Sequence, residues 1–137
     1  MKNSISKIIA ILFLTTVFTS CSVDMFNRVS GNRNVVSQDR AISDNFTGIK
    51  VSTGIDLYIT QGSKNQIKVE ADENLQDIII TEVINGVLKV HSEKNIWSAK
   101  AKKVHVTIKN LELLTATSGS DVYGKGLIET KEISIST

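Results

Sequence analysis

The stretch that decides the fold is Phe46–Gly62, with the sequence FTGIKVSTGIDLYITQG. Its aliphatic residues fall on odd-numbered positions, and polar residues or a tyrosine lie between them. A period of two places one face of a β-strand against a core and the other in water. The stretch therefore predicts strand structure, bent or turned at its glycines. The aliphatic positions are Ile49, Val51, Ile55, Leu57 and Ile59, and the outward ones are Lys50, Ser52, Asp56, Tyr58 and Thr60.

The composition of the whole chain favours an all-β domain. The 137 residues suffice for one domain, and 41% hydrophobic with 22% charged residues is a globular balance. Aromatic residues make up only 5%, so packing rests on Ile, Val and Leu, and there is no proline. A formal net charge of +2 argues against nucleic acid as a partner, because a phosphate-binding surface needs clustered Lys and Arg.

The first residues have the pattern of an export signal. Lys2 and Lys7 lead into the apolar segment Ile8–Phe18, which small residues and Cys21 follow. The apolar segment is shorter than the roughly 20 residues of a spanning helix. Phe18–Cys21 resembles a bacterial lipoprotein signal, which implies that residues 1–20 are removed and that Cys21 is lipidated. The alternative is an ordinary signal peptide with an incidental free cysteine, since Cys21 is the only cysteine in the chain.

The rest of the chain divides into a tether and a domain. Residues 21–30 have no sustained period and are interpreted as a flexible tether, and 31–137 as the domain. Asn85-Gly86 predicts a tight β-hairpin, because a type I′ turn needs positive φ at both positions. Gly62–Asn65 is interpreted as a second hairpin loop, between strands ending near Gly62 and starting at Gln66. Asp72–Leu75 is interpreted as a solvated polar turn, with room for one helical turn.

The end of the chain carries a repeat. Asn110–Ser118 (NLELLTATS) and Glu129–Thr137 (ETKEISIST) align with a shift of 19 positions. Leu114 then falls on Ile133 and Ala116 on Ile135, all expected to point inward. Short strands repeating near 20 residues, with Gly/Ser corners, are typical of a solenoid. The second copy stops before its corner, so the sequence predicts a solenoid truncated at its C-terminal end.

These segments, in this order, are similar to the head GIN domain family, also described as a "putative auto-transporter adhesin" domain. The resemblance implies a right-handed β-helix-like solenoid in the envelope or on the surface of Gram-negative bacteria. It carries no catalytic residues or cofactor to transfer. Arg33 stands in the first turn, where members tend to have glycine. The matching segments are GNRNVVSQDR (Gly31–Arg40), Phe46–Gly62, VEADENL (Val69–Leu75), NGVLKV (Asn85–Val90) and TSGSDVYGKG (Thr117–Gly126).

Four residues are candidates for surface contact: Asp56, Tyr58, Asp121 and Tyr123. Asp121 follows the corner Ser118-Gly119-Ser120, where a short carboxylate usually bonds turn amides, although a glycan or calcium contact stays open. Tyr123 and Trp97 could stack on a sugar ring, but we expect half-buried loop aromatics.

Other charged groups suggest no defined site. His91 and His105 are expected to be solvated strand residues rather than metal ligands. Asp72, Glu73 and Asp77 match no known calcium loop. The lysines of 100–103 could contact anionic sugars or lipid head groups, but such runs are more often solvated loops.

The sequence leads to three functional hypotheses. The first is a lipid-anchored envelope protein, in the outer membrane, whose non-enzymatic head binds a surface glycan or an envelope protein. The second is a periplasmic protein-binding module in envelope-stress or transmembrane signalling. The third, a polysaccharide-acting β-helix enzyme, is disfavoured because no carboxylate pair among Asp56, Glu70 and Glu82 is placed for it.

Overall fold

The computed structural model of the protein describes residues 27–42 and 45–136. The predicted signal peptide and the predicted lipidation site Cys21 therefore lie outside the described residues. Within them, no helix has the length and apolar character needed to cross a membrane. The elements are β1 (Arg28–Ser30), β2 (Val35–Arg40), β3 (Gly48–Val51), β4 (Asp56–Gln61), β5 (Gln66–Asp72), the 3-10 helix η3 (Glu73–Leu75), β6 (Ile79–Ile84), β7 (Val87–Ser92), β8 (Asn95–Ser98), β9 (Lys102–Ile108), β10 (Leu113–Ala116), β11 (Val122–Lys125) and β12 (Glu132–Ile135).

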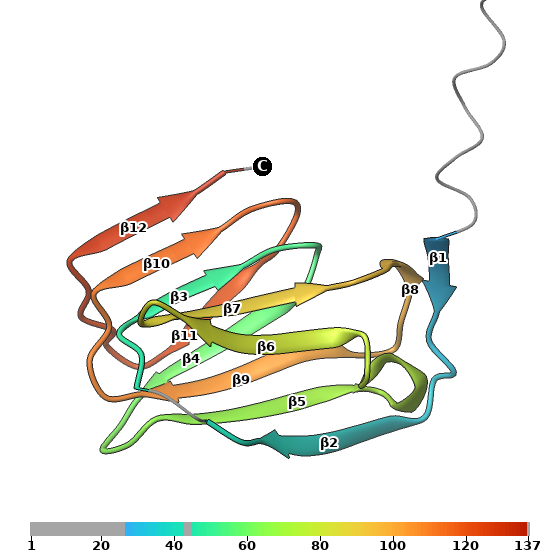
Figure 1. The fold of residues 1–137 in the computed structure, drawn as a ribbon, viewed down its shortest axis with the longest axis horizontal. Helices are drawn as coiled ribbons and strands as arrows, with labels where there is room; N and C mark the ends of the chain where they lie inside the picture. Colours follow the sequence, from blue (N-terminus) through green and yellow to red (C-terminus); the bar gives the residue numbers. More distant parts are fainter. Residues whose placement is uncertain (1–26, 43–44, 137) are drawn as a thin grey trace, which may run out of the picture.

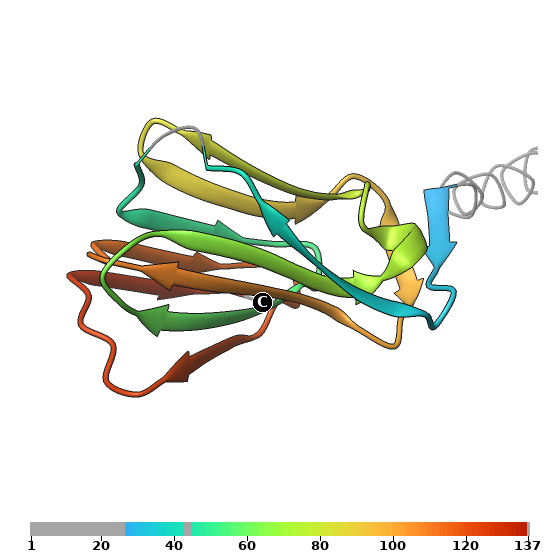
Figure 2. The same ribbon diagram turned by 90° about the horizontal axis from the view of Figure 1, so that it is seen from below.

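The strands form two five-stranded sheets that face each other across the core, which confirms the all-β prediction. One sheet has the order β12-β10-β3-β7-β6 and the other β11-β4-β9-β5-β2. We call them the first and the second sheet. Figure 2 shows them as separate layers. A small third pair, β1 with β8, lies at one end of both sheets (Figure 1).

Alternating residues of both sheets meet in the core. Ile49 and Leu88 of the first sheet are fully buried, as are Leu57 and Val104 of the second. The predicted inward row of Phe46–Gly62 is buried throughout, because each of its aliphatic residues falls on the core side of β3, β4 or the corner between them. The stretch therefore supplies one strand to each sheet and fixes which face of each is apolar.

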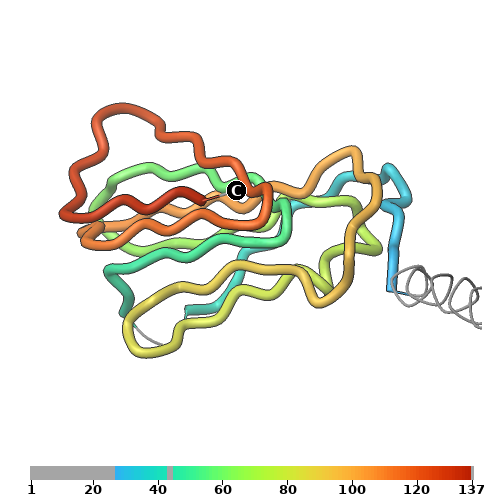
Figure 3. The backbone as a smooth tube through the Cα atoms, turned by 90° about the horizontal axis from the view of Figure 1, so that it is seen from above, coloured from blue at the N-terminus to red at the C-terminus, as the bar shows by residue number. Residues whose placement is uncertain are grey.

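Parallel strands stack as successive coils. The chain passes from β3 to β4, and from β10 to β11, crossing from the first sheet to the second each time; β10 pairs β3 and β11 pairs β4, both in parallel. Figure 3 shows the continuation from β10 through β11 to β12. Strand β12 pairs β10 with Leu114 opposite Ile133 and Ala116 opposite Ile135, which confirms the predicted register. Ile133 and Ile135 therefore stand on the same side of the sheet as the buried Leu114 and Ala116, but they are 58% and 67% exposed because β12 is the edge strand.

The corners of two neighbouring coils have the same backbone conformation. Thr53 and Gly54 have φ of 62° and 68°, and Ser118 and Gly119 have φ of 56° and 72°. The N–H of Gly54 donates to the carbonyl of Ser118 at 3.0 Å, so one corner lies on the other. This conformation favours glycine at the second position, which explains why the corners read Thr-Gly and Ser-Gly.

The hairpin predicted at Asn85-Gly86 is confirmed. Strands β6 and β7 pair antiparallel, with Ile84 opposite Val87. Asn85 and Gly86 have φ of 50° and 75°, the positive values that a type I′ turn requires.

The hairpin predicted at Gly62–Asn65 is wrong. Strand β9 lies between β4 and β5, parallel to the first and antiparallel to the second. The loop crosses over the end of β9, where the N–H of Gly62 donates to Ile108 and that of Lys109 donates to the side chain of Asn65. A loop of four residues is long enough to span one intervening strand, so its turn residues do not distinguish a hairpin from a crossing.

The solenoid prediction is met only in part. The sheets are open and mixed, because β2, β5 and β6 pair antiparallel at one end of the stack. Local sequence patterns predict strands and their faces but do not fix which strands become neighbours. The structure thus establishes an all-β fold of open sheets with stacked parallel coils.

The described domain begins before the predicted boundary at residue 31. Arg28–Ser30, predicted as tether, pairs with β8, and Gly31 extends this contact by donating to the carbonyl of Ser98 at 2.7 Å. Arg33 has φ of 65°, so it takes the left-handed conformation in the turn where the family tends to have glycine. Its N–H is held by the carboxylate of Asp72 at 2.9 Å, which compensates the unfavourable conformation.

Candidate functional site

The outward side of the second sheet gathers the aromatic and charged residues of β11, β4, β9 and β5. We call it the tyrosine face. Its residues alternate with the buried ones along each strand, so they stand on the solvent side of the sheet. The face is defined by Asp121, Tyr123, Asp56, Tyr58, Lys103, His105, Lys68 and Glu70.

One row of this face is a stack of three rings. Tyr123 lies opposite Tyr58 and Tyr58 opposite His105 on successive parallel strands. The ring centroids of Tyr123 and Tyr58 are 4.8 Å apart with 18° between planes, and those of Tyr58 and His105 are 5.1 Å apart with 27°. At that separation the rings face one another rather than lie flat on the sheet. The stack therefore presents ring edges and hydroxyls to solvent, and Tyr123, in an edge strand, has one ring face uncovered by Tyr58.

The adjacent row is charged. Asp56 lies opposite Lys103, and Lys103 opposite Glu70. Val122 of β11 lies opposite Leu57 of β4. Asp121 directly precedes Val122 and Asp56 directly precedes Leu57, so the two aspartates are neighbours. Burial, partly offset by Lys102, raises the pKa of Asp56, and the charge of Asp121 raises it further. The charge of Asp121 also raises the pKa of Tyr123.

His105 joins the two rows. Its Nε2 lies 2.9 Å from a carboxylate oxygen of Glu70, and Lys103 Nζ lies 3.6 Å from the other. The hydrogen bond from His105 lowers the pKa of Glu70 and outweighs the opposite effect of partial burial. These contacts fix the orientation of the imidazole that closes the ring stack.

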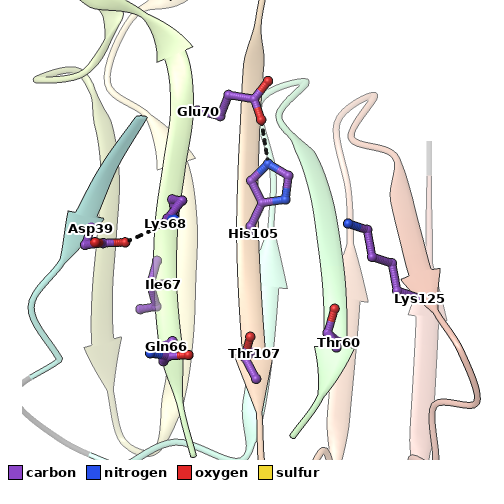
Figure 4. Close-up of a pocket in the computed structure, with 9 residues that line it drawn as sticks. All are labelled: Asp39, Thr60, Gln66, Ile67, Lys68, Glu70, His105, Thr107 and Lys125. Atoms are coloured by element: carbon purple, nitrogen blue, oxygen red, sulfur yellow. Dashed lines mark hydrogen bonds and ion pairs between the residues drawn. The ribbon is translucent and has the colours of Figure 1, made fainter. Parts of the chain in front are cut away.

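A shallow depression of about 520 Å³ adjoins the ring stack (Figure 4). Lys125 and Lys68 contribute ammonium groups, and Thr60 and Thr107 contribute hydroxyls. Lys68 is paired with Asp39 at 3.8 Å. Such a surface can donate and accept hydrogen bonds over a broad polar area. The lining residues are Asp39, Thr60, Gln66, Ile67, Lys68, Glu70, His105, Thr107 and Lys125.

The structure brings together all four residues chosen from the sequence as contact candidates. Asp56 and Tyr58 lie on β4, Tyr123 lies on β11, and Asp121 directly precedes β11. The two tyrosines and the two aspartates form adjacent rows of the tyrosine face. Sequence reasoning missed His105 as their partner, because the pairing of β9 with β4 joins segments far apart in the chain. Glu82 lies on β6 of the other sheet, so it does not join Asp56 and Glu70.

Asp72 is not the solvated turn residue that the sequence predicted. It is completely buried. Its carboxylate accepts hydrogen bonds from the backbone N–H groups of Arg33, Lys100 and Ala101 at 2.9–3.1 Å. Gly31 is required beside it, since a Cβ there would clash with Asp72 Oδ2. These oxygens are used in holding loops together, so Asp72 acts as a structural residue.

Trp97 and Tyr123 also differ from expectation. Both lie in strands rather than loops; Tyr123 is half-buried as expected, at 46% exposure, whereas Trp97 is 67% exposed. Arg28 lies over the indole of Trp97, 4.6 Å from the ring centroid. Residues 27–42 and 45–136 contain no group of three or more His, Cys, Asp or Glu residues placed to hold a metal ion.

Solved structures from Parabacteroides and Bacteroides species share this fold at low identity. A "putative adhesin" from Parabacteroides merdae is 22% identical, with a TM-score of 0.63 over 72% of this chain and 42% of its own. A "putative lipid binding protein" from Parabacteroides distasonis is 24% identical, with a TM-score of 0.62 over 72% and 44%. A "putative adhesin" from Bacteroides fragilis is 16% identical, with a TM-score of 0.66 over 78% and 53%. The chain thus spans about half of these proteins or less.

The family assignment comes from the sequence match. No curated protein is significantly similar to the chain. The family described as "Putative auto-transporter adhesin, head GIN domain" matches residues 45–137. Because this match covers well over half of the chain, the chain belongs to the head GIN domain family.

Proposed function

We propose that this chain is an exported, lipid-anchored envelope protein whose head mediates adhesion or surface interaction through the tyrosine face, without catalysis. The observation that carries the proposal is the ring stack Tyr123–Tyr58–His105 on an open sheet face, bordered by charged residues and by a polar depression. The family is described as adhesin-like, which supports an envelope or surface location.

The chemistry of the face suits a glycan or a polar protein surface. The uncovered ring face of Tyr123 is available to stack on a sugar ring, since Tyr58 occupies only its other side. Thr60 and Thr107 offer hydroxyls, and Lys125 offers an ammonium group, beside the stack. Shallow, polar surfaces of this kind bind through many weak contacts rather than by enclosing a ligand.

The same geometry supports a non-enzymatic role. Asp56 and Asp121 are neighbours, but neither lines the depression beside the ring stack, and the two carboxylates that do, Asp39 and Glu70, are each paired with a lysine. Lys103 lies between Asp56 and Glu70, so an ammonium group separates those two carboxylates. Glycoside hydrolysis needs two carboxyl groups about 5–10 Å apart on either side of a bound sugar. A flat face with one shallow depression does not enclose a sugar in that way.

Anchoring through a lipid on Cys21 would orient the face. The first described strand, β1, lies at one end of both sheets, so a tether there leaves the tyrosine face open at the side of the stack (Figures 1 and 2). The proposed location is the outer membrane, and the adhesin description of the family supports an envelope or surface position. The stacked coils further support a solenoid arrangement of the head, with the parallel register of β3, β10 and β12 as its repeating unit.

The test is binding of the full chain to arrays of surface glycans, to immobilised host matrix proteins and to envelope fractions. The double variant Tyr58→Ser/Tyr123→Ser removes the ring stack, and Lys50→Ala/Lys89→Ala makes a matched change on the outward side of the other sheet. We expect about tenfold weaker binding for the first variant only, with unchanged secondary structure by circular dichroism. Equal binding by both variants, or no binding by the unmodified chain, would contradict the proposal.

A further inference from the structure

We propose that the end of the domain where β1 meets β8 is a second membrane contact, which docks on the head groups of an anionic bilayer. The patch is defined by Arg28, Lys94, Trp97 and Lys100, all of which are exposed. We call it the N-proximal patch. It lies away from the tyrosine face and has no part in the adhesion proposed above.

Trp97 gives the patch its apolar anchor. An indole that is 67% exposed buries only a minor part of its surface in the domain, while the neighbouring Ile96 packs partly against the core. Tryptophan is enriched at membrane interfaces, where the ring lies among the head groups and its N–H stays hydrated. The strand pairing between β1 and β8 holds the indole rigidly at this end of the domain.

The charges around Trp97 complement an anionic surface. Arg28 lies 4.6 Å from the ring centroid, Lys94 directly precedes β8 in the chain, and Lys100 follows the end of β8 by two residues. Glu93 borders the patch in sequence, and Glu73, which accepts hydrogen bonds from the side chains of Asn32 and Asn34, lies at the turn after β1. Cations beside an anionic bilayer contribute to binding in proportion to their number, within about one Debye length. The guanidinium that covers one face of the indole can bind a lipid phosphate at the same depth.

Chain length places the patch next to the bilayer. This step rests on the proposed lipidation of Cys21. Arg28 is seven residues after Cys21, and seven residues span at most about 25 Å when fully extended. A domain tethered so closely presents the strand that follows its tether, and the paired β8, to the membrane.

The test uses Trp97 as a reporter, because it is the only tryptophan in the chain. The membrane-extracted protein is reconstituted into vesicles that contain phosphatidylglycerol and lipids brominated near the head group, which quench indole fluorescence at short range. The mass of the N-terminal peptide reports whether Cys21 carries acyl chains. We expect Trp97 quenching in these vesicles, and about tenfold less partition of unlipidated protein after Lys94→Gln/Lys100→Gln. The matched control is Lys64→Gln/Lys109→Gln, which removes two exposed lysines at the opposite end of the strands.

The outcomes separate the two proposals. A lipidated, membrane-bound protein whose Trp97 is not quenched overturns the N-proximal patch and leaves the anchor intact. If Cys21 is unmodified, the proposed lipid anchor is wrong. Trp97 quenching of the same unlipidated protein, added to the vesicles, then tests the N-proximal patch independently. Quenching there supports it, and no quenching overturns it. Equal loss of partition in the patch and control variants would also overturn it, because it would show general charge attraction alone.

Discussion

The carboxylate of Asp72 accepts a hydrogen bond from the backbone N–H of Ala101 at 2.9 Å, in a site where Asp72 has no exposure to solvent. The same carboxylate holds the N–H groups of Arg33 and Lys100. One buried side chain thus joins the turn after β1, the end of β5 and the loop that leads into β9. The N-proximal end of the domain depends on this contact.

Replacing this residue should therefore destabilise the domain. Asp72→Asn removes the charge and turns one acceptor into a donor that faces backbone N–H groups. We expect a loss of about 2–4 kcal/mol in the free energy of unfolding, measured by urea titration. Asp39→Asn is the control, since its carboxylate is 84% exposed and pairs with Lys68 at 3.8 Å. It should change stability by less than about 1 kcal/mol. Equal effects of the two substitutions would contradict the structural role.

The same site should make stability depend on acid pH. Burial raises the pKa of Asp72, but hydrogen bonds from the backbone of Lys100, Ala101 and Arg33 outweigh it and leave the pKa below its usual value. A lowered folded-state pKa gives stability that is present above the unfolded value of about 3.9 and is lost as pH falls through the folded value. The difference in stability between wild type and Asp72→Asn should then narrow below about pH 4. A difference that stays constant from pH 6 to the acid limit of folding would show that Asp72 titrates normally.

The ring stack should appear as a coupling energy. In a double-mutant cycle of Tyr58→Ala and Tyr123→Ala we expect a coupling of about 0.5–1.5 kcal/mol, because stacked aromatic pairs contribute beyond their buried area. A cycle of Tyr58→Ala with Lys50→Ala, on the outward side of the other sheet, should give additive effects. Urea titration of the four variants of each cycle measures both. Additivity in the tyrosine pair would mean that the stack does not persist in solution.

Asp121 should raise the pKa of the nearby Tyr123. The charge of Asp121 is the main cause that raises the pKa of Tyr123. Asp121→Asn should therefore let Tyr123 ionise at lower pH than in the wild type, followed by ultraviolet absorbance in a background carrying Tyr58→Phe. Glu129→Gln, which removes an exposed charge from the loop between β11 and β12, should leave the titration unchanged. An unchanged titration in Asp121→Asn would place the carboxylate away from the ring.

Much of the local structure could be predicted from the sequence. The alternation in Phe46–Gly62 is determined by the contrast between buried and solvated positions, which is local to each strand. The turn at Asn85-Gly86 and the corner at Ser118-Gly119 follow from the need for positive φ. The pairing of Leu114 with Ile133 follows from repeated sequence, because equivalent segments stack in register.

The arrangement of strands could not be predicted in the same way. Nothing in Gly62–Asn65 states that β9 inserts beside β4, since the pairing is decided by burial across the whole sheet. His105 stacks on Tyr58 only because β9 pairs with β4. The sequence wrongly predicted a solvated Asp72, because its hydrogen-bond partners are backbone N–H groups from two other segments. Contacts between distant segments leave no signal in the local pattern of either one.

The most direct test of the adhesion surface is chemical modification of the two tyrosines while the chain is bound. Tyr58 and Tyr123 are the only tyrosines in the sequence, so tyrosine nitration measured by mass spectrometry reports on the tyrosine face alone. The free chain is compared with the chain held on the glycan or matrix surface that retains it. We predict that binding slows modification of both residues, and of Tyr123 most, since it is the more exposed. Retention with both tyrosines modified at the rate of the free chain would contradict the account.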